Sequence, residues 1–341
     1  MIKSICLVRL SALGDVLMCV PLVRTLQRHL PKSSITWVIS EPAYSLVAGM
    51  AGIEFIVIDK PNGLKDYWRF KQQMRSRKFD ILFAAQASFR ANLLYPCIRA
   101  DRKIGYDRIR AKDGHHWFID EAITPGRDHT LESFLKFAET IGLSPPDIRW
   151  DLPIPAEAQV WAAEQLPQDS IFLVNPAASK PERSWSAERY INVIRYVQDK
   201  YKLSVVLTGG PGTHDRSLGD AIAAAVPVIN LIGKTKPKQL LAVIQRAHLV
   251  LCPDTGPSHM AAAVGTSVIA LHAVTNVDIS GPYPFRHQAI NLYPEAVQTV
   301  FGKTVETIPW GTHVHGDQAM GLIDVEQVKG QIDQVLMKDD V

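Results

Sequence analysis

Short apolar runs alternate with amphipathic stretches along the whole chain, a pattern typical of alternating strands and helices. In the first half these runs predict strands at residues 5–8, 37–39, 55–58 and 81–84. Apolar residues at helical spacing predict a helix over 15–30, which Pro31 ends, and another over 132–141. Because the strands are apolar on both faces, we expect a parallel sheet that is covered by helices on both sides.

The second half repeats this pattern. Its apolar runs predict strands at 171–174, 205–208, 228–231, 249–251 and 268–271, and its amphipathic stretches predict helices at 188–200, 237–246 and 325–336. Proline-rich segments at 144–146 and 153–155 predict a linker. A chain of 341 residues exceeds what one core usually supports. We therefore expect an α/β protein with two Rossmann-like, doubly wound domains facing a central ligand cleft.

Composition narrows the class of protein. With 47% hydrophobic residues, 21% charged residues and a net charge of +3, the chain has the make-up of an ordinary globular protein and gives no reason to expect nucleic acid. Its four cysteines form no C-x-x-C pair, and no apolar stretch is long enough to span a membrane. The first residues indicate a strand rather than a signal peptide. These features predict a cytoplasmic protein with reduced cysteines.

The stretch 252–262 joins a predicted strand to a predicted helix. The free N–H groups and the dipole of such a helix N-terminus favour a bound anion. Gly256 lets the backbone approach a ligand closely, and Thr255 and Ser258 offer hydroxyl groups. Asp254 can accept hydrogen bonds from sugar hydroxyls, and His259 points toward the same anion. Each residue alone also fits a simple capped helix, but the whole cluster at a strand end favours a ligand site.

Two further loops follow predicted strands. In residues 11–15 the carboxylate of Asp15 is either a helix cap or a base that takes a proton from an acceptor hydroxyl. In residues 175–185, Lys180 or Arg183 would neutralise a diphosphate leaving group, unless this is simply a solvated basic loop.

Dinucleotide and metal chemistry fit the sequence less well. The first loop has only Gly14, and the glycine-rich segment 209–212 has Asp215 where a third glycine is required, so NAD binding and a P-loop are disfavoured. No Asp-x-Asp pair occurs. The histidines at 115–116 and at 313 and 315 lack nearby cysteine or carboxylate partners in the sequence, which favours loop positions over metal ligands.

Residues 9–21, with Gly14-Asp15, and residues 253–259 together resemble the ADP-heptose:lipopolysaccharide heptosyltransferases of glycosyltransferase family 9. The similarity runs along nearly the whole chain with the same motif order. It implies the GT-B architecture, with an acceptor-binding domain at 1–152, an ADP-sugar-binding domain at 153–320, and a helix at 321–341 that packs back toward the first domain. It also implies transfer of L-glycero-D-manno-heptose from ADP-heptose, with inversion, to the lipopolysaccharide inner core.

The resemblance also implies residue roles. Asp15 would be the general base, Asp254 would bind heptose hydroxyls, and Thr255, Gly256 and His259 would hold the diphosphate. Arg183 stands where family members commonly carry lysine, which leaves the role of nearby Lys180 open. Asp215, or else His214, would reach the ribose. The acceptor side would consist of Ser11, Gly14, Gln86 and Arg90, although Ala87 replaces the glycine that usually follows Gln86.

The implied reaction requires no metal or other cofactor, because protein cations and a helix dipole can neutralise the diphosphate. Residues 309–316 resemble the branch that acts on a phosphorylated single Kdo, which suggests heptosyltransferase I activity on Kdo–lipid A. Heptosyltransferase II or III, another family 9 transferase, and a non-catalytic sugar-nucleotide-binding protein remain alternatives, and the presence of Asp15 disfavours the last.

Residues 60–112 form a basic tract with two interpretations. Its charges either lie on solvated helix faces or form a surface for an acidic acceptor and the anionic inner leaflet, which would make the protein peripheral to the inner membrane. Nucleic acid is disfavoured because no aromatic-rich RNA motif accompanies the charges. The sequence gives no oligomeric state.

Overall fold

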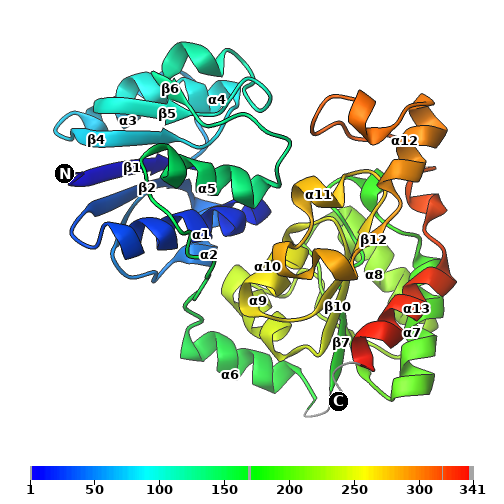
Figure 1. Cartoon of the computed structure of the whole chain (residues 1–341). Helices are drawn as coiled ribbons and strands as arrows, with labels where there is room; N and C mark the ends of the chain where they lie inside the picture. The colour runs from blue at the N-terminus through cyan, green and yellow to red at the C-terminus, as the bar shows by residue number, and fades with distance from the viewer. Residues whose placement is uncertain (1, 168–169, 317, 338–341) are drawn as a thin grey trace. The chain divides into compact units, whose positions relative to one another are not determined.

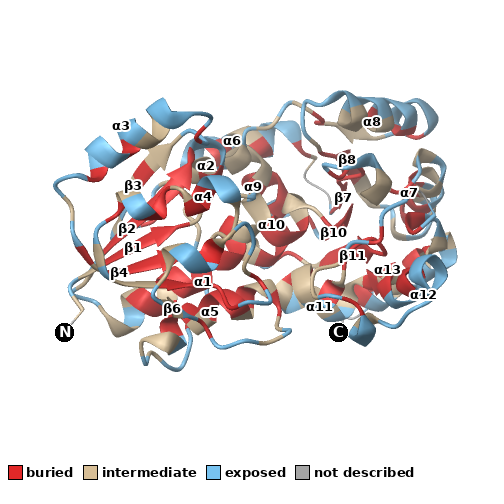
Figure 2. Cartoon of the chain, turned by 90° about the horizontal axis from the view of Figure 1, so that it is seen from above, coloured by how far each residue is buried: buried red, intermediate tan, exposed pale blue. Residues whose placement is uncertain are grey.

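The computed structural model describes residues 2–167, 170–316 and 318–337. It divides the chain into two compact units, Met1–Pro153 and Ile154–Val341 (Figure 1). Each unit contains its own sheet, and buried residues concentrate in the strands and on the helix faces that cover them (Figure 2). Within the described ranges, no helix is both long and apolar enough to cross a bilayer.

The first unit has a six-stranded sheet in the order β3-β2-β1-β4-β5-β6, and its strand pairs are parallel. The strands are β1 (Ser4–Val8), β2 (Ser34–Ser40), β3 (Ile53–Ile58), β4 (Phe79–Ala84), β5 (Ala100–Gly105) and β6 (Glu121–Ala122). The helices are α1 (Leu13–His29), α2 (Glu41–Val47), α3 (Leu64–Met74), α4 (Phe89–Asn92) and α5 (Thr130–Thr140). On one face of the sheet α1 packs against α2 and α5, while Cys6 and Val8 point to the other face and pack with residues of α3 and α4.

The second unit repeats this topology, with the order β12-β11-β10-β7-β8-β9 and parallel pairs. Its strands are β7 (Ile171–Val174), β8 (Ser204–Leu207), β9 (Ile229–Asn230), β10 (Leu249–Pro253), β11 (Val268–His272) and β12 (Ile290–Asn291). Its helices are α6 (Ala156–Gln165), α7 (Ala187–Tyr201), α8 (Thr213–Ala225), α9 (Pro237–Arg246), α10 (Gly256–Val264), α11 (Val277–Ser280), α12 (Tyr293–Phe301) and α13 (Val325–Leu336). In chain order both sheets are the 3-2-1-4-5-6 arrangement of doubly wound folds.

Helix α13 packs against α7 within the second unit. The hydroxyls of Tyr196 and Tyr201 donate to the carboxylate of Asp333 at 2.7 and 2.6 Å, and Lys200 pairs with the same carboxylate. The expected packing of residues 321–341 toward the first domain therefore stays a prediction, and residues 338–341 of that segment lie outside the described residues.

The predicted strands and helices occur, with small shifts at their ends. The predicted strand at 228–231 is reduced to the two residues of β9, and α10 begins at Gly256, earlier than the apolar run suggested. The sequence missed β5, β6 and β12. The first of these carries the charged residues 101–103, and the other two are only two residues long, so none shows the apolar run by which a buried strand is recognised.

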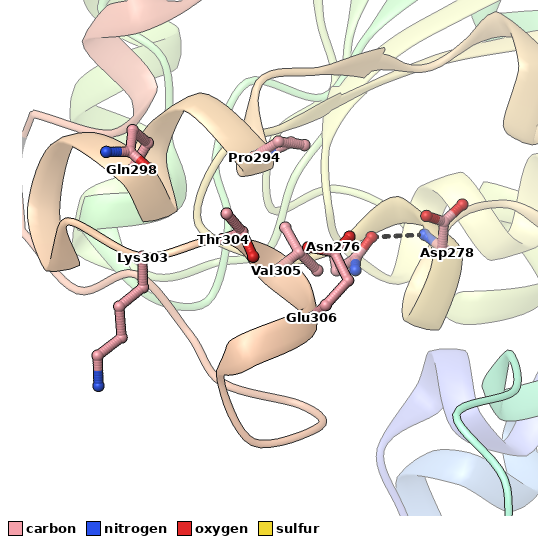
Figure 3. Close-up of a pocket in the computed structure, with 8 residues that line it drawn as sticks. All are labelled: Asn276, Asp278, Pro294, Gln298, Lys303, Thr304, Val305 and Glu306. Atoms are coloured by element: carbon pink, nitrogen blue, oxygen red, sulfur yellow. Dashed lines mark hydrogen bonds between the residues drawn. The ribbon is translucent and has the colours of Figure 1, made fainter.

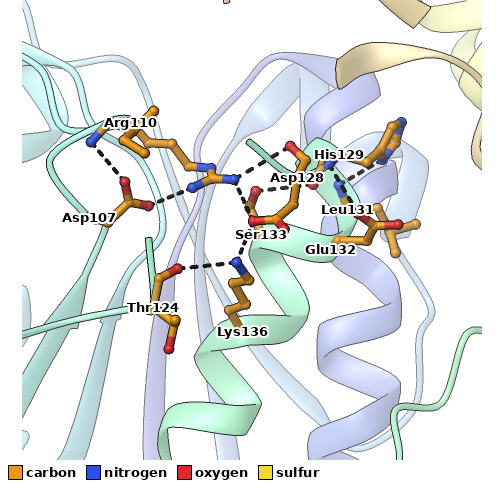
Figure 4. Close-up of polar contacts among 10 residues, drawn as sticks. Asp107, Arg110, Thr124, Asp128, His129, Leu131, Glu132, Ser133 and Lys136 are labelled. Carbon is orange, nitrogen blue, oxygen red and sulfur yellow. Dashed lines mark hydrogen bonds and ion pairs between the residues drawn. The ribbon is translucent and has the colours of Figure 1, made fainter. Parts of the chain in front are cut away.

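A buried ion-pair network holds the segment after β5 onto α5 (Figure 4). The Arg110 guanidinium contacts Asp107 at 2.6 Å and Asp128 at 3.0 Å, and the side chains of Arg110 and Asp107 are 3% and 1% exposed. Lys136 of α5 also pairs with Asp128 and donates to the carbonyl of Thr124 at 3.2 Å. The basic tract is therefore not made of solvated helix faces alone, because one of its arginines is a buried structural residue.

Replacing Arg110 with alanine should lower the free energy of unfolding by about 3–5 kcal/mol, because the buried carboxylate of Asp107 loses its partner. Urea denaturation followed by circular dichroism measures this change. The matched control is Arg102→Ala, which breaks the half-exposed pair with Glu121 and should cost no more than about 1 kcal/mol. Equal losses in the two variants would contradict a structural role for burial at Arg110.

Candidate functional site

In each sheet there is one pair of neighbouring strands whose following connections run to opposite faces of the sheet. In the first unit this pair is β1 and β4, and in the second it is β7 and β10. A crevice opens beyond the carboxyl ends of the strands at such a position, and ligands of doubly wound folds bind there. The residues that follow these four strands therefore form the candidate site of each unit.

In the first unit, Asp15 lies in the first turn of α1, directly after β1. Its carboxylate contacts the guanidinium of Arg9 at 2.5 Å and accepts a hydrogen bond from the backbone N–H of Ala12 at 3.0 Å. Burial works against the charge on Arg9, but the neighbouring Asp15 carboxylate holds the pKa of Arg9 above its usual value. Arg9 also donates to the carbonyl of Ala85 after β4, so one arginine joins both loops at the crevice. Asp15 is thus a helix cap and also a positioned carboxylate, still 29% exposed.

Gln86 joins the same two loops. Its side-chain oxygen accepts from the backbone N–H of Leu10 at 2.7 Å and lies 3.4 Å from that of Ser11. The residues predicted for the acceptor side therefore divide into two groups. Ser11, Gly14 and Gln86 lie at the crevice, whereas Arg90 is exposed on α4, where its backbone carbonyl accepts from Tyr67.

In the second unit, Asp254 follows β10 and is 8% exposed. Its Oδ2 atom accepts from the hydroxyl of Thr275 at 2.7 Å, lies 3.4 Å from the hydroxyl of Ser280, and lies 3.6 Å from a guanidinium nitrogen of Arg183. Burial alone would raise the pKa of the Asp254 carboxyl. The neighbouring histidines 272 and 259, the Thr275 hydroxyl and Arg183 together hold that pKa below its usual value, so the carboxylate stays ionised.

Arg183 and Lys180 have different surroundings. The side chain of Arg183 is 18% exposed, donates to the hydroxyl of Ser179 at 2.6 Å, and has a buried Nε–H with no hydrogen-bond partner among the described residues. Lys180 is exposed at the start of the short helical turn Pro181–Arg183. Of the two cations, Arg183 is the one that lies beside Asp254.

The N-terminus of α10 contains the other residues predicted to bind the diphosphate. Thr255 is the N-cap and Gly256 is the first helical residue, and both are half-buried, while His259 is 7% exposed. The hydroxyl of Ser258, which the sequence suggested as a ligand contact, is buried within the turn. Ser258 is fully buried and donates to the carbonyl of Thr255 at 2.7 Å, so it braces the turn instead.

Asp215 and His214 lie in the first turn of α8. The Asp215 carboxylate accepts from the backbone N–H of Gly210 at 2.8 Å, and His214 lies 2.9 Å from the hydroxyl of Ser184. These contacts tie the loops after β8 and β7 to α8. The proposed contact with a ribose stays a prediction for either residue.

The segment 309–316 lies next to the loop after β7. His315 contacts the carboxylate of Glu182 at 2.7 Å, and the backbone N–H of Val314 donates to Val274 at 2.9 Å. Burial, with positive Arg183 nearby, lowers the pKa of His313, while the Asp254 charge opposes that shift. The segment therefore belongs to the surroundings of Arg183 and Asp254. Among the described residues, no group of three or more His, Cys, Asp or Glu side chains has an arrangement that suits a metal ion.

A cavity of about 260 Å³ lies next to this site (Figure 3). It is lined by Asn276 and Asp278 at the start of α11, by Pro294 and Gln298 of α12, and by residues 303–306. The Asn276 side chain accepts from the backbone N–H of Asp278 at 2.9 Å. Because Ser280 at the other end of α11 contacts Asp254, this short helix connects the cavity to the buried carboxylate.

Sequence reasoning missed three residues around Asp254, namely His272, Thr275 and Ser280. Part of their signal was present, since His272 and Thr275 lie just beyond the predicted strand 268–271, which pairs with β10, whereas Ser280 lies at the far end of α11. His272 is fully buried, its Nδ1 lies 3.2 Å from the Thr275 hydroxyl, and its Nε2 has no hydrogen-bond partner among the described residues. Burial lowers the pKa of His272.

Comparison with known proteins gives one family. The pattern that defines glycosyltransferase family 9 (heptosyltransferase) matches residues 67–307. The chain is 33% identical over 334 residues to the lipopolysaccharide core heptosyltransferase OpsX of Haemophilus influenzae. This match covers 97% of this chain and 96% of that protein. It is 21% identical to lipopolysaccharide heptosyltransferase 1 of Escherichia coli K12, over 85% of this chain and 97% of the relative.

Two solved structures share the fold. A glycosyl transferase family 9 protein from Veillonella parvula gives a TM-score of 0.80 at 22% identity, covering 98% of this chain and 97% of that one. The Escherichia coli heptosyltransferase WaaC, solved with ADP, gives a TM-score of 0.73 at 18% identity, covering 98% and 100%. These likenesses confirm the predicted fold class.

Replacing Thr275 with valine removes the hydroxyl that donates to Asp254, so the pKa of Asp254 should rise and the free energy of unfolding should fall by about 1–3 kcal/mol near neutral pH. In the folded protein this pKa lies below its usual value. Its contribution to stability is therefore present above the unfolded-state pKa of about 4 and is lost as pH falls through the folded-state pKa. Urea denaturation across pH should show the difference between variant and wild type shrinking below about pH 4.

The control for this prediction is Thr275→Ser, which keeps the hydroxyl and should behave as wild type. A Thr275→Val variant as stable as Thr275→Ser at neutral pH would show that the hydrogen bond does not stabilise the Asp254 carboxylate.

Proposed function

The chain belongs to glycosyltransferase family 9, the heptosyltransferases, and we propose that it transfers L-glycero-D-manno-heptose from ADP-heptose to Kdo of the lipopolysaccharide inner core. It is a glycosyltransferase of GT-B architecture with two Rossmann-like units. Support for the substrates comes from OpsX, a relative that is named as a lipopolysaccharide core heptosyltransferase and matches nearly the whole chain.

The arrangement at the N-terminus of α10 carries the proposal for the donor. A helix N-terminus that begins at Gly256 lies next to Asp254, and Asp254 lies 3.6 Å from Arg183. The N–H groups of the helix, with Thr255 and His259, would hold the diphosphate of ADP-heptose, and the partly exposed guanidinium of Arg183 would neutralise it. The known contacts of Asp254 go to Oδ2, so Oδ1 would accept from heptose hydroxyls.

Asp15 is proposed as the general base. The acceptor hydroxyl oxygen would form a bond to the anomeric carbon of heptose on the face opposite the diphosphate, and the bond from that carbon to the phosphate oxygen would break, which inverts the configuration. Asp15 would take the hydroxyl proton, while Arg9 keeps its carboxylate oriented. ADP would leave with its charge neutralised by Arg183 and the α10 dipole, so the step needs no metal or other cofactor.

The acceptor is proposed to be Kdo–lipid A, with Kdo phosphorylated. The support is segment 309–316, which lies beside Arg183 and bears His313 and His315. Ser11, Gly14, Gln86 and Arg90 are proposed for the acceptor side, and Asp215 for the ribose. A central cleft between the two domains, the cytoplasmic location and the metal-independence remain predictions.

The nearest alternatives keep the fold and change the acceptor, as in heptosyltransferase II or III. Assays with Kdo–lipid A, its Kdo-phosphorylated form, and acceptors that already carry heptose separate these activities. The other alternative is a non-catalytic sugar-nucleotide-binding protein, which would bind ADP-heptose and turn over none of these acceptors.

Replacing Asp15 with asparagine should lower the turnover rate by about 10²–10⁴-fold, because asparagine cannot accept the acceptor proton. The amide oxygen can still accept from Ala12, so the loop should keep its shape. Turnover is measured as ADP release, and ADP affinity, measured by calorimetry, should be unchanged. The control is Asp101→Asn, which removes an exposed carboxylate paired with Lys78. A wild-type rate in Asp15→Asn would exclude Asp15 as the base.

Arg183→Gln should weaken ADP binding by about 1–3 kcal/mol, whereas Lys180→Gln should leave it nearly unchanged, because Arg183 lies beside Asp254 while Lys180 is exposed to solvent. The measurement is a thermal-shift titration with ADP, UDP, GDP and NAD, with and without magnesium. Arg183→Lys should recover part of the loss. A larger effect at Lys180 would reverse the assignment, and stabilisation by UDP or GDP instead of ADP would change the donor.

A further inference from the structure

The first unit exposes large apolar side chains at one edge of its sheet. Leu64 is 88% exposed, Trp68 65%, Phe89 63% and Trp117 77%. Leu64 and Trp68 lie one turn apart on α3, which begins after the carboxyl end of β3, while Phe89 begins α4 after β4. Trp117 belongs to the helical turn His115–Phe118, on the connection that follows β5. All four therefore follow carboxyl ends of strands, at the edge where Asp15 and Gln86 also lie.

Hydrogen bonds join these segments into one surface. The hydroxyl of Tyr67 on α3 donates to the carbonyl of Arg90 on α4 at 3.1 Å. The backbone N–H of Phe89 donates to the Asp113 carboxylate at 2.8 Å, which joins α4 to the connection after β5. The ring of Trp117 lies over Gly114, since a Cβ on that glycine would come within 2.5 Å of the ring. We call this the α3–α4 surface.

Exposed cations lie near the apolar residues of the α3–α4 surface in the sequence, at Lys65, Arg69, Arg90, Arg108 and Lys112. Fewer exposed or half-exposed acidic groups lie in the same segments, namely Asp66, Asp113 and Asp120, and each has a hydrogen-bond partner. The Asp66 carboxylate accepts from the backbone of Asn62 and lies 3.6 Å from Arg69, and Asp113 accepts from Phe89. The surface therefore presents separate aromatic and aliphatic side chains in a field of positive charge.

We propose that the α3–α4 surface docks on an anionic lipid bilayer, with Trp68 and Trp117 inserted among the headgroups. Tryptophan favours the membrane interface because its ring has an apolar body and a polar N–H, and lysines and arginines close to the bilayer gain from its negative surface potential. Apolar side chains interleaved with cations suit such an interface better than a dry protein contact, whose core is depleted of lysine.

The place of the surface on the sheet adds to this argument. Phe89 follows Gln86 by three residues, so docking would bring the predicted acceptor side of the first unit close to the headgroups. The meaning of this placement rests on the proposed function, because an acceptor built on lipid A is held in a bilayer. Docking itself depends only on the surface.

The test is co-sedimentation of the full chain with vesicles of phosphatidylcholine alone and of phosphatidylcholine mixed with phosphatidylglycerol, without donor or acceptor. We expect binding to the anionic vesicles that weakens at high salt. The paired substitutions Trp68→Ser with Trp117→Ser, and Lys65→Glu with Lys112→Glu, should each reduce the partition coefficient by at least about tenfold. The matched controls are Phe301→Ser, an exposed aromatic of the second unit, and Lys32→Glu, an exposed lysine that precedes β2 at the opposite sheet edge.

A second measurement reports insertion directly. Lipids brominated on their acyl chains should quench part of the tryptophan emission in wild type, and this quenching should be lost in Trp68→Phe with Trp117→Phe. Melting temperatures and ADP titrations of all variants confirm that they fold. The proposal is overturned if the anionic vesicles do not bind wild type, if the controls lose as much binding as the surface variants, or if the surface instead forms a dimer that the same substitutions dissociate.

Failure of docking and failure of the proposed function give different results. Vesicle binding without transfer to any acceptor would leave docking intact and exclude the transferase. Transfer to a delipidated, water-soluble acceptor without vesicle binding would overturn docking and leave the transferase activity intact.

Discussion

Each site depends on one pair of neighbouring strands. The connections that follow these two strands run to opposite faces of the sheet. In the first unit Leu7 of β1 pairs with Phe83 of β4, and in the second Leu173 of β7 pairs with Val250 of β10. Because these pairs are central and parallel, four loops emerge at the carboxyl edges with room between them. The two units repeat the same topology, but their carboxylates follow different members of the central pair: Asp15 follows β1, whereas Asp254 follows β10, which is the counterpart of β4.

The two carboxylates have different electrostatic surroundings. Asp15 contacts Arg9 and a backbone N–H, and it remains partly exposed. Asp254 is more deeply buried and needs Thr275, Ser280 and Arg183 around it. A buried charge is costly unless it is paired and hydrogen-bonded, so these partners are part of the site even where they touch no substrate. Asp15, the proposed base, and Asp254, the proposed sugar-binding carboxylate, thus differ by environment rather than by residue type.

Charged residues explain why the sequence did not predict strand β5. Residues 101–103 of β5 are polar because the strand lies beside the two-residue β6, and Arg102 pairs with Glu121 of that strand at 2.7 Å. The hydrophobic pattern of a strand disappears when neighbouring side chains neutralise one another across the sheet. The basic tract is likewise not a single feature. Its members include a buried arginine, a strand and the cations of the α3–α4 surface, which have different partners in space.

The sequence by itself determined the alternation of strands and helices, the doubly wound fold class, and the loops that carry Asp15, Arg183 and Asp254. These are local properties, since hydrophobic period, helix punctuation and glycine positions act over a few residues. Only the tertiary structure decided which loops meet. Gln86 reaches the backbone of Leu10 across 76 positions of sequence, and Thr275 reaches Asp254 across 21. Such contacts follow from strand order and register, which are set by the packing of the whole sheet and leave no mark on any one segment.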